Sequence, residues 1–363
     1  SKDEKNKDYK YSYNYQNWYP SAEFETKNAR LNLGLFELSP FSKFDLKGEK
    51  VHEELQILCT ANIPNEPGKI KYTQMLNSDG GIETDLTVIC IEKNYFRIVS
   101  SAANREHDKF HILKHISKDV ELIDVTEDYC CLGLFGPKSR EMISSISSDD
   151  FSNDNFKFAT AKLIKIDGLE VWAQRISYVG ELGFELYVKK EKALKLFDIL
   201  MDKGKSFQIS LCGMHAMDIM RMESGYLHWG HDISPEENQF EAGLNFAISF
   251  KKNINFIGRA ALENKRNKKD HKKLKMLILN NSKEGAPLLL HDEPIYLKDK
   301  IVGRTTSGCY SFIYSKNLAF GYINSGLSSD EIDKAPFEIE VEKKKYTASV
   351  ITRPLNDKKL SSL

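Results

Sequence analysis

The chain contains 363 residues, with 52 basic and 52 acidic side chains, so its formal charge at neutral pH is zero. Without an excess of cationic groups, no general electrostatic attraction favours nucleic acids or anionic membranes, and we expect neither as a partner. Hydrophobic residues make up 41% of the sequence and charged residues 29%, which is typical of folded proteins and excludes a disordered chain. The length predicts two or three domains.

Neither a membrane-spanning nor a secretory segment is evident in the sequence. No apolar run approaches the roughly 20 residues that a spanning helix needs, and the first twenty residues lack a signal-peptide core. The six cysteines include no CxxC pair, which favours reduced thiols. We therefore expect a cytoplasmic protein, or one of the mitochondrial matrix if the source is eukaryotic. Because the chain starts at Ser1, a stand-alone protein and a piece excised from a longer one both stay open.

Hydrophobic periodicity predicts alternating helices and strands up to about residue 224. Helices are expected over 22–33, 51–62, 102–116, 138–146, 192–203 and 215–224, and strands over 41–48, 69–76, 82–91, 95–100, 129–135, 160–166, 169–175 and 184–188. A Gly-Gly turn at 77–81 joins two of these strands. The basic run at 263–275 is interpreted as a solvated connection, with a phosphate or polyglutamate contact as the alternative. From Leu274 to Leu355, short strands and Gly/Pro/Asn/Asp turns indicate an all-β domain.

Several common catalytic and cofactor motifs are missing from the sequence. Because GxGxxG, the phosphate-binding P-loop and the GxSxG elbow are all absent, we expect no flavin or nucleotide site on this chain. His107, His111 and His115 are spaced four apart, as metal ligands on a helix can be. With no HExxH motif and no third ligand type, a half-exposed helix face is the favoured interpretation and we expect no metal site.

Two acidic positions suggest ligand binding. Asp85 lies in a predicted strand near the boundary of its apolar face, where a half-buried carboxylate needs hydrogen-bond donors; the alternative is a solvated position beside Thr87. Glu181 directly follows a glycine of a predicted turn, and Glu185 lies two residues after the next glycine, in the predicted strand. A carboxylate can accept two parallel N–H bonds from an amidine-like edge, such as that of a pterin, whereas the alternative is a hairpin with exposed acids.

Several segments, taken in order, resemble the folate-dependent one-carbon transferase family typified by the glycine-cleavage T protein. They resemble most closely the C-terminal, folate-binding half of dimethylglycine and sarcosine dehydrogenases. The matching segments are NWYP (17–20), LFELSPFSKF (35–44), YTQMLNSDGGIETDLTV (72–88), YVGELGFELYV (178–188), HWGHDISPEENQFEAGLNFAI (228–248), FIGR (256–259) and RPLNDKK (353–359).

The resemblance implies an α+β fold, a three-domain cloverleaf around a central folate pocket, with two αβ domains and a C-terminal all-β, barrel-like domain. We expect a discontinuous first domain over 1–50 and 140–250, a second over 51–139, the basic connection over 251–275 and the β domain over 276–363. The family's functional positions imply Asp85 as the catalytic residue at the reactive end of the pterin. They imply folate-binding roles for the aromatic, hydroxyl and acidic residues Tyr72, Thr87, Tyr178, Glu185 and, less closely matched, Tyr226.

The function implied by this resemblance is one-carbon transfer to tetrahydrofolate. An iminium or formaldehyde unit from an N-methyl amine, of the dimethylglycine or sarcosine type, would give 5,10-methylenetetrahydrofolate. Where glycine-cleavage proteins carry an Arg, this chain has Met217 before Asp218, which argues for the dehydrogenase-type branch. The alternatives are a folate-dependent methyltransferase or demethylase, a glycine-cleavage-type aminomethyltransferase, and a non-catalytic folate-binding module. The dehydrogenases carry an N-terminal flavin domain, so a flavoprotein partner or a missing flavin domain are both open.

Overall fold

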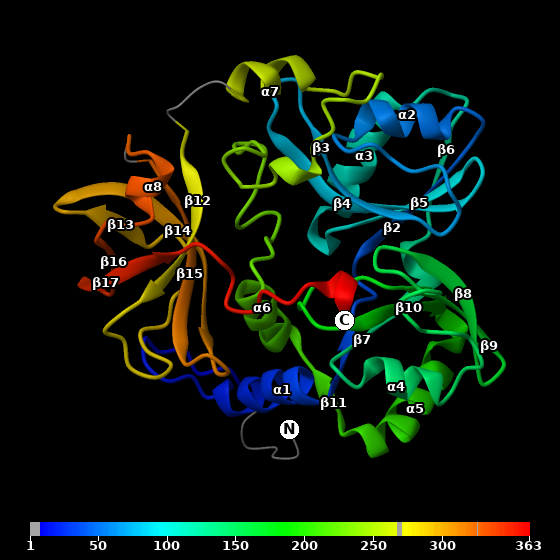
Figure 1. The fold of residues 1–363 in the computed structure, drawn as a ribbon, viewed down its shortest axis with the longest axis horizontal. Coiled ribbons are helices and arrows are strands. Elements are labelled where there is room, and N and C mark those ends of the chain that lie inside the picture. The colour runs from blue at the N-terminus through cyan, green and yellow to red at the C-terminus, as the bar shows by residue number, and fades with distance from the viewer. Residues whose placement is uncertain (1–7, 267–270, 325) are drawn as a thin grey trace.

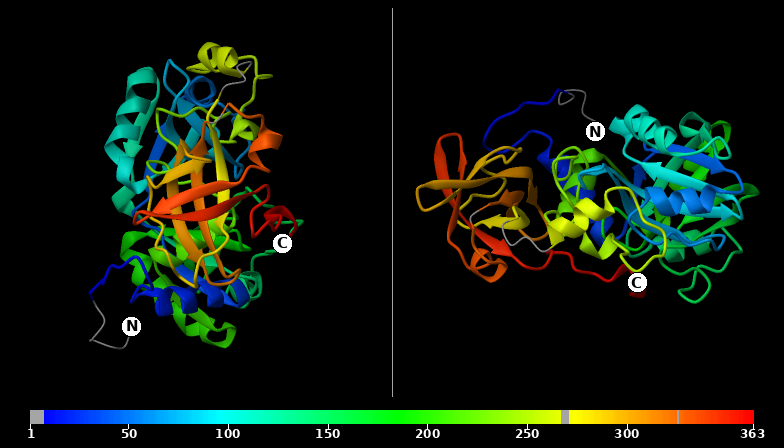
Figure 2. Two further views of the ribbon diagram at one scale, coloured as in Figure 1. Left: turned by 90° about the vertical axis from the view of Figure 1, so that its left-hand side faces the viewer. Right: turned by 90° about the horizontal axis from the view of Figure 1, so that it is seen from above.

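In the computed structural model, which describes residues 8–266, 271–324 and 326–363, two β-sheets and a β-barrel form three lobes around a central region (Figure 1). The barrel stands to one side of both sheets, as the view from above also shows (Figure 2). The expected α+β class with a C-terminal all-β domain is therefore confirmed. Among the described residues, no helix combines the length and apolar character needed to cross a bilayer.

The first lobe is built on a five-stranded antiparallel sheet with the order β3-β4-β5-β2-β6. Its strands are β2 (Ser42–Lys47), β3 (Ile70–Leu76), β4 (Ile82–Glu92), β5 (Tyr95–Ser100) and β6 (Glu121–Asp124). Helices α2 (Val51–Leu58) and α3 (Arg105–His115) contribute to a core on its outer face, together with Phe44, Leu86 and Val88. The other face of the sheet is consequently free to face the second lobe.

The second lobe is built on a six-stranded sheet with the order β11-β1-β7-β10-β9-β8, in which only the β1–β11 pair is parallel. Its strands are β1 (Leu33–Glu37), β7 (Tyr129–Phe135), β8 (Ala161–Ile166), β9 (Leu169–Gln174), β10 (Gly183–Lys189) and β11 (Ile209–Cys212). Its helices are α1 (Tyr19–Leu31), α4 (Ser139–Ser144), α5 (Ala193–Gly204) and α6 (Met214–Glu223). Residues of β7, β9, β10 and α5 form the core on its outer face.

Strand pairing differs from two of the expected boundaries. Residues 42–47 were expected in the first domain, but β2 pairs with β5 and β6, and its Phe44 and Leu46 belong to the core of the five-stranded sheet. Residues 129–135 were expected in the second domain, but β7 pairs with β1 and β10. The chain crosses between the two sheets before β2 and again after β6, and local periodicity carries no information about which sheet a strand joins. The division into domains otherwise stays a prediction.

The third lobe is a closed barrel with the order β12-β15-β14-β13-β16-β17. Its strands are β12 (Lys273–Leu279), β13 (Pro294–Leu297), β14 (Lys300–Ser311), β15 (Lys316–Ile323), β16 (Phe337–Val341) and β17 (Lys344–Ile351), with the short helix α8 (Ser329–Ile332). Closure leaves no unpaired edge strand. Helix α7 (Arg259–Arg266) ends just before the barrel, so the expected basic connection is helical at its start; residues 267–270 of that run lie outside the described ranges.

A segment that we call the central segment, residues 225–258, follows α6 and runs between the lobes toward α7 (Figure 1). It is tied to the five-stranded sheet by the Ile82 amide, which donates to the Glu237 carbonyl at 2.9 Å, and by the Trp229 indole, which donates to the Ile82 carbonyl at 3.1 Å. The Ser249 amide donates to the Thr60 carbonyl at 3.0 Å. These bonds hold the central segment against one end of β4.

A buried ionic cluster joins α1, α6 and the turn before β10. The Arg30 guanidinium donates to Glu223 Oε2 at 2.6 and 3.0 Å and to Glu181 Oε1 at 3.0 Å. Ser311, on barrel strand β14, donates to the other Glu223 oxygen at 2.6 Å. All three charged side chains are at most 4% exposed, so loss of one charge leaves the others desolvated without compensation.

We expect Arg30→Met to lower the free energy of unfolding by about 3–5 kcal/mol, because Glu223 would be left charged and buried. The matched control is Lys27→Met on the same helix, where the ion pair with Glu23 is exposed and its loss is worth about 0–1 kcal/mol. Urea denaturation of the three proteins gives both values. A loss below about 1 kcal/mol for Arg30→Met would show that the cluster does not stabilise the fold.

Candidate functional site

The two sheets face each other across a shared apolar cluster. This cluster takes Ile70, Ile89 and Val99 from the five-stranded sheet and Cys131, Phe135 and Tyr187 from the six-stranded sheet. We call the sides of the sheets that carry these residues the inner faces. The candidate site is formed by polar side chains that interrupt this apolar surface.

Strand β4 carries its accessible polar residues on the inner face. Glu83, Asp85 and Thr87 are half-buried, whereas the alternating residues Ile82, Thr84, Leu86 and Val88 are buried. Since successive side chains of a strand point to opposite faces, this exposure pattern shows that the inner face of β4 borders an opening, whereas its other face is closed. The expected position of Asp85 at the boundary of an apolar face agrees with this arrangement.

Strand register brings further residues to the same face. Tyr72 on β3 pairs with Thr87 on β4, Thr87 pairs with Val99 on β5, and Val99 pairs with Lys43 on β2. Cα partners in neighbouring strands direct their side chains to the same face of a sheet. Tyr72, Thr87 and Lys43 therefore lie in one row across the inner face, and Asp85, whose partner is Gln74, lies in the next row.

Asp85 is held by neutral hydrogen-bond donors. Gln74 Nε2 donates to Asp85 Oδ1 at 2.7 Å, and the Tyr72 hydroxyl is a second donor to the carboxylate. Burial raises the pKa of Asp85 to about 6, an effect that these two hydrogen bonds oppose. With no cationic partner among the described residues, the carboxylate is ionised at neutral pH and yet close to its titration range, which suits a group that accepts a proton.

Gln74 is oriented by the central segment. Gln239 donates through Nε2 to Gln74 Oε1 and, at 3.0 Å, to Thr60 Oγ1. With its oxygen occupied as an acceptor, the Gln74 amide must direct its NH₂ group toward Asp85. Gln74 and Gln239 are both fully buried, so this chain of amides fixes the donor to Asp85.

Four aromatic rings form two stacked pairs, and one tyrosine of each pair interacts with this carboxylate. Tyr72 stacks on Phe246 of the central segment, with ring centroids 6.1 Å apart, and Tyr178 stacks on Tyr226 at 6.2 Å. The Tyr178 hydroxyl donates to the Leu227 carbonyl at 2.8 Å. Burial raises the pKa of both Tyr72 and Tyr178, and each also interacts electrostatically with Asp85. All of these tyrosines are half-buried, so their rings remain accessible.

Glu185 lies on the inner face of the opposite sheet. The Tyr187 hydroxyl donates to Glu185 Oε2 at 2.7 Å. Burial raises the pKa of Glu185 to about 7, while Tyr187 and the nearby charge of Lys43 lower it. Lys43 itself has no carboxylate within salt-bridge distance among the described residues. Its ammonium donates to the carbonyls of Ser39 and Phe41, both at 2.8 Å, and burial lowers its pKa.

The structure thus brings most of the expected site residues together. Tyr72, Asp85 and Thr87 share one face, Tyr178 lies within electrostatic range of Asp85 and Tyr72, and Tyr226 stacks on Tyr178. Glu185 lies on the facing sheet, where the charge of Lys43, in the row of Tyr72 and Thr87, lowers its pKa; no direct contact joins Glu185 to Asp85 among the described residues. The second acidic candidate, Glu181, is instead a fully buried member of the Arg30 cluster and also binds Lys358 at 2.7 Å.

Three contributing residues were not expected from the sequence: Gln74, Gln239 and Lys43. Gln74 lies two residues after Tyr72 on β3 and therefore on the same face, so counting back from the Gly-Gly turn could have placed it opposite Asp85. Lys43 is adjacent to Phe44 in the strand and therefore points to the opposite face, and a lysine in a strand is ordinarily expected to be exposed to solvent. Its burial against a second sheet is a tertiary effect, as is the contact of Gln239 with a residue 165 positions away.

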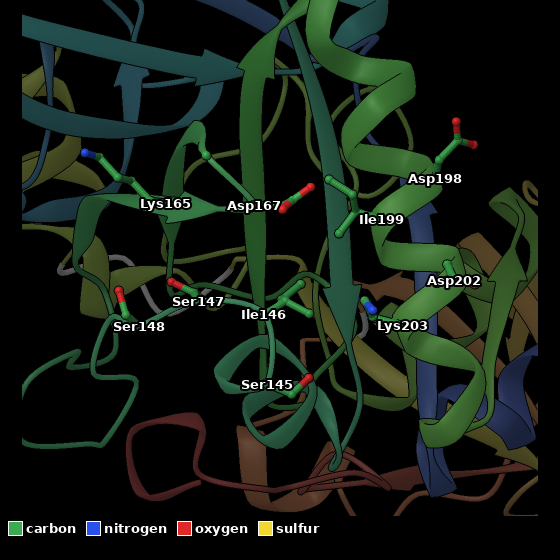
Figure 3. Close-up of a pocket in the computed structure, with 11 residues that line it drawn as sticks. Ser145, Ile146, Ser147, Ser148, Lys165, Asp167, Asp198, Ile199, Asp202 and Lys203 are labelled. Carbon is green, nitrogen blue, oxygen red and sulfur yellow. The ribbon is translucent and has the colours of Figure 1, made fainter.

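Two surface hollows lie away from these residues. The larger, of about 810 Å³, is lined by residues 145–148, which follow α4, by α5 and by the β8–β9 turn, and Figure 3 shows Lys165, Asp198 and Lys203 around it (Figure 3). The other, of about 530 Å³, lies between the barrel and the central segment and includes His231, Lys272 and Arg304. Neither includes an expected site residue.

His107 bonds to Glu83 and Asp108 at 3.0 and 3.1 Å, and the described residues include no group of three or more acidic, His or Cys side chains arranged for a metal.

Comparison with known proteins places the whole chain in one family. The model of the GCVT N-terminal domain matches residues 4–252, and that of the glycine cleavage T-protein C-terminal barrel domain matches residues 272–357. The structure of glycine cleavage system aminomethyltransferase T from Bartonella henselae superposes with a TM-score of 0.82, at 22% identity, over 93% of this chain and 90% of that one. This likeness is one of fold.

Relatives with curated names fall into two groups. 4-Methylaminobutanoate oxidase (formaldehyde-forming) of Paenarthrobacter nicotinovorans is 34% identical over 97% of this chain, and human dimethylglycine dehydrogenase is 33% identical over 96%. The chain spans only 42% and 40% of their lengths. An aminomethyltransferase of Halothermothrix orenii is 31% identical over 84% of both chains. Two matched domain models and full-length similarity at this level show that the chain belongs to the glycine-cleavage T-protein family of folate-dependent one-carbon transferases.

Proposed function

We propose that this chain binds tetrahydrofolate between the inner faces and transfers to it a one-carbon unit from an N-methyl amine. The observation that carries the proposal is Asp85, a reachable carboxylate whose pKa is raised to about 6 by burial and which two neutral donors hold on an inner face. The donor set fits a reduced pterin: two acids can accept its N–H groups, and aromatic rings can pack on its faces.

The proposed reaction removes two protons from the folate amines. A methylene iminium transfers its carbon to these two amines: two C–N bonds form, the C=N bond of the iminium and two folate N–H bonds break, one proton passes to the departing amine and the other is released. With formaldehyde as donor, both protons leave with the formaldehyde oxygen as water. The protein must hold both reactants, exclude water and accept a proton. Asp85 is the proposed proton acceptor and stabilises the cationic donor, and Glu185 holds the ring, with Tyr72, Thr87, Tyr178 and Tyr226 lining the pocket.

Similarity to the dimethylglycine dehydrogenase and the formaldehyde-forming oxidase supports an N-methyl amine as the source of the carbon. Because those proteins are more than twice as long as this chain, we propose that a flavoprotein, as a separate subunit or a further domain, oxidises the amine. A glycine-cleavage-type reaction is the second candidate, favoured by the aminomethyltransferase that matches over 84% of its length. Met217, buried in the inner cluster where the family motif has Arg, argues against it.

Calorimetric titration of the intact protein with tetrahydrofolate tests the proposal, followed by product analysis after addition of formaldehyde. We expect binding and 5,10-methylenetetrahydrofolate. 5-Methyltetrahydrofolate would favour a methyltransferase, tight binding without turnover even with the flavoprotein and amine supplied would favour a binding module, and no binding would refute the proposal.

Asp85→Asn is expected to leave the dissociation constant of tetrahydrofolate nearly unchanged and to lower the rate of one-carbon transfer by about 10²–10⁴-fold, since an amide cannot accept the proton. In the unsubstituted protein the rate falls as the pH drops through about 6, because protonation removes the acceptor. Single-turnover rates between pH 5 and 8 measure both effects. Asp79→Asn, in the exposed turn before β4, is the control; a pH profile unchanged in Asp85→Asn would contradict this role.

Gln74→Met is expected to shift the acidic limb of the same rate profile to higher pH, because the donor that stabilises the ionised Asp85 is lost. The pH profile should move while the rate at pH 8, where Asp85 is ionised, changes less. Comparison of the profile midpoints measures this shift. An unmoved midpoint would show that the Gln74 bond does not set the acidity of Asp85.

Glu185→Gln is expected to weaken tetrahydrofolate binding, since one of the two oxygen acceptors becomes a donor. The pKa of about 7 predicts that binding to the unsubstituted protein weakens about tenfold from pH 8 to pH 6, as the carboxylate is protonated, and that this dependence disappears in the variant. Dissociation constants at three pH values test it. Glu170→Gln, at an exposed position near the start of β9, should bind normally; equal pH dependence in Glu185→Gln would exclude Glu185 as the responsible group.

A further inference from the structure

Gln174, the last residue of β9, is the Cα partner of Glu185 on β10. Their side chains therefore point to the same inner face, with Cβ atoms about 5 Å apart. Gln174 also pairs with Ala161 on β8, whose amide donates to the Gly68 carbonyl at 2.7 Å. This contact places Gln174 and its neighbours at the end of the inner faces where the six-stranded sheet meets the start of β3.

The Gln174 amide is fully buried, and neither its Nε2 nor its Oε1 has a hydrogen-bond partner among the described residues. The other buried glutamines differ from it: Gln16, Gln56 and Gln74 both donate and accept, and Gln239 donates through Nε2, although its Oε1 has no partner among the described residues. Trp172 Nε1, two positions earlier on the same face, is also without a partner in the described ranges. Buried amides are ordinarily satisfied, so an amide with both groups unpaired beside a candidate ligand-binding acid points to a ligand.

Glu185 and Gln174 differ in hydrogen-bonding capacity. An ionised carboxylate only accepts, whereas a primary amide both donates and accepts. On a 2-amino-4-oxo pterin the donors N3–H and 2-NH₂ are adjacent, and acceptors flank them on both sides, O4 next to N3 and N1 next to the amino group. A carboxylate that binds the two donors cannot also bind the flanking acceptors O4 and N1. An amide N–H beside that carboxylate can donate a hydrogen bond to one of them.

We infer that Gln174 is a second ring-binding residue, which donates to the acceptor next to the donor pair that Glu185 binds. This assignment rests on the proposed function and extends it to the recognition of the ring. The four residue steps from Ile70 to Gln74 along β3 span about 13 Å, and Gln74 is the partner of Asp85. Ring recognition at Gln174 and proton transfer at Asp85 therefore occupy opposite ends of the inner faces.

Gln174→Met and Gln174→Glu test the inference by calorimetric binding of tetrahydrofolate at pH 8 and by thermal denaturation without ligand. Methionine removes both polar groups at similar length, whereas glutamate replaces the donor by an acceptor and adds a second carboxylate beside Glu185. We expect both variants to weaken binding about tenfold, the effect of one lost hydrogen bond with its acceptor left buried. We expect the melting temperature of Gln174→Met to be no lower than that of the unsubstituted protein, because the lost amide had no partner. Gln56→Met, where the amide bonds to Ile63, is the control that should lower the melting temperature without changing binding.

Two results would overturn the inference in distinguishable ways. If the unsubstituted protein binds tetrahydrofolate and Gln174→Met binds it equally well, the Gln174 assignment is wrong and the proposed function stands. If the unsubstituted protein itself does not bind, the proposed function fails and the assignment fails with it. Weakened binding in both variants, with an undiminished melting temperature in Gln174→Met, supports a contact with the ring, because a purely structural amide would affect stability and not binding.

Discussion

Two β-sheets can enclose a reactive carboxylate only if the same strands serve both a closed core and an open face. Strand β4 meets this constraint by strict alternation: Thr84, Leu86 and Val88 are buried, while Glu83, Asp85 and Thr87 face the inner side. A shift of register by one residue would reverse the two sets and place the carboxylate in the apolar core. The chemistry of the site therefore depends on pairing with β3 and β5, which fixes that register.

The buried polar residues of the protein are stabilised in two different ways. Asp85 and Glu185 are paired with neutral donors, which permits their pKa values to rise to about 6 and about 7. The Arg30 cluster pairs charge with charge at full burial and joins α1 and α6 to the barrel. An arginine beside Asp85 would keep it permanently ionised and a poor proton acceptor. The Arg97–Asp45 ion pair of the inner face lies in the row of Ile89, two rows from Asp85, so Asp85 keeps neutral partners and can titrate near neutral pH.

Sequence patterns predict the architecture well and the second half of the site poorly. The strand 129–135 was predicted at its observed bounds, and the Gly-Gly hairpin places Asp85 correctly, because alternation and turn chemistry are local. Strands β1, β6 and β11 were not predicted, since they are short and take their partners from distant segments. Local reasoning could not separate Glu181 from Glu185 either: they lie four residues apart, but one faces Arg30 and the other the inner face.

The position of the central segment affects the acidity of Asp85. The same stretch of chain that hydrogen-bonds to Ile82 and Thr60 also supplies Gln239, which turns the Gln74 amide toward Asp85. If this stretch separates from the sheet, the Gln74 amide is free to flip and to direct its oxygen toward the Asp85 carboxylate. At unchanged burial, the affinity of Asp85 for a proton would then rise. The position of the backbone and the acidity of Asp85 are thus linked, and a pKa near 6 requires both the burial of the carboxylate and the correctly turned Gln74 amide.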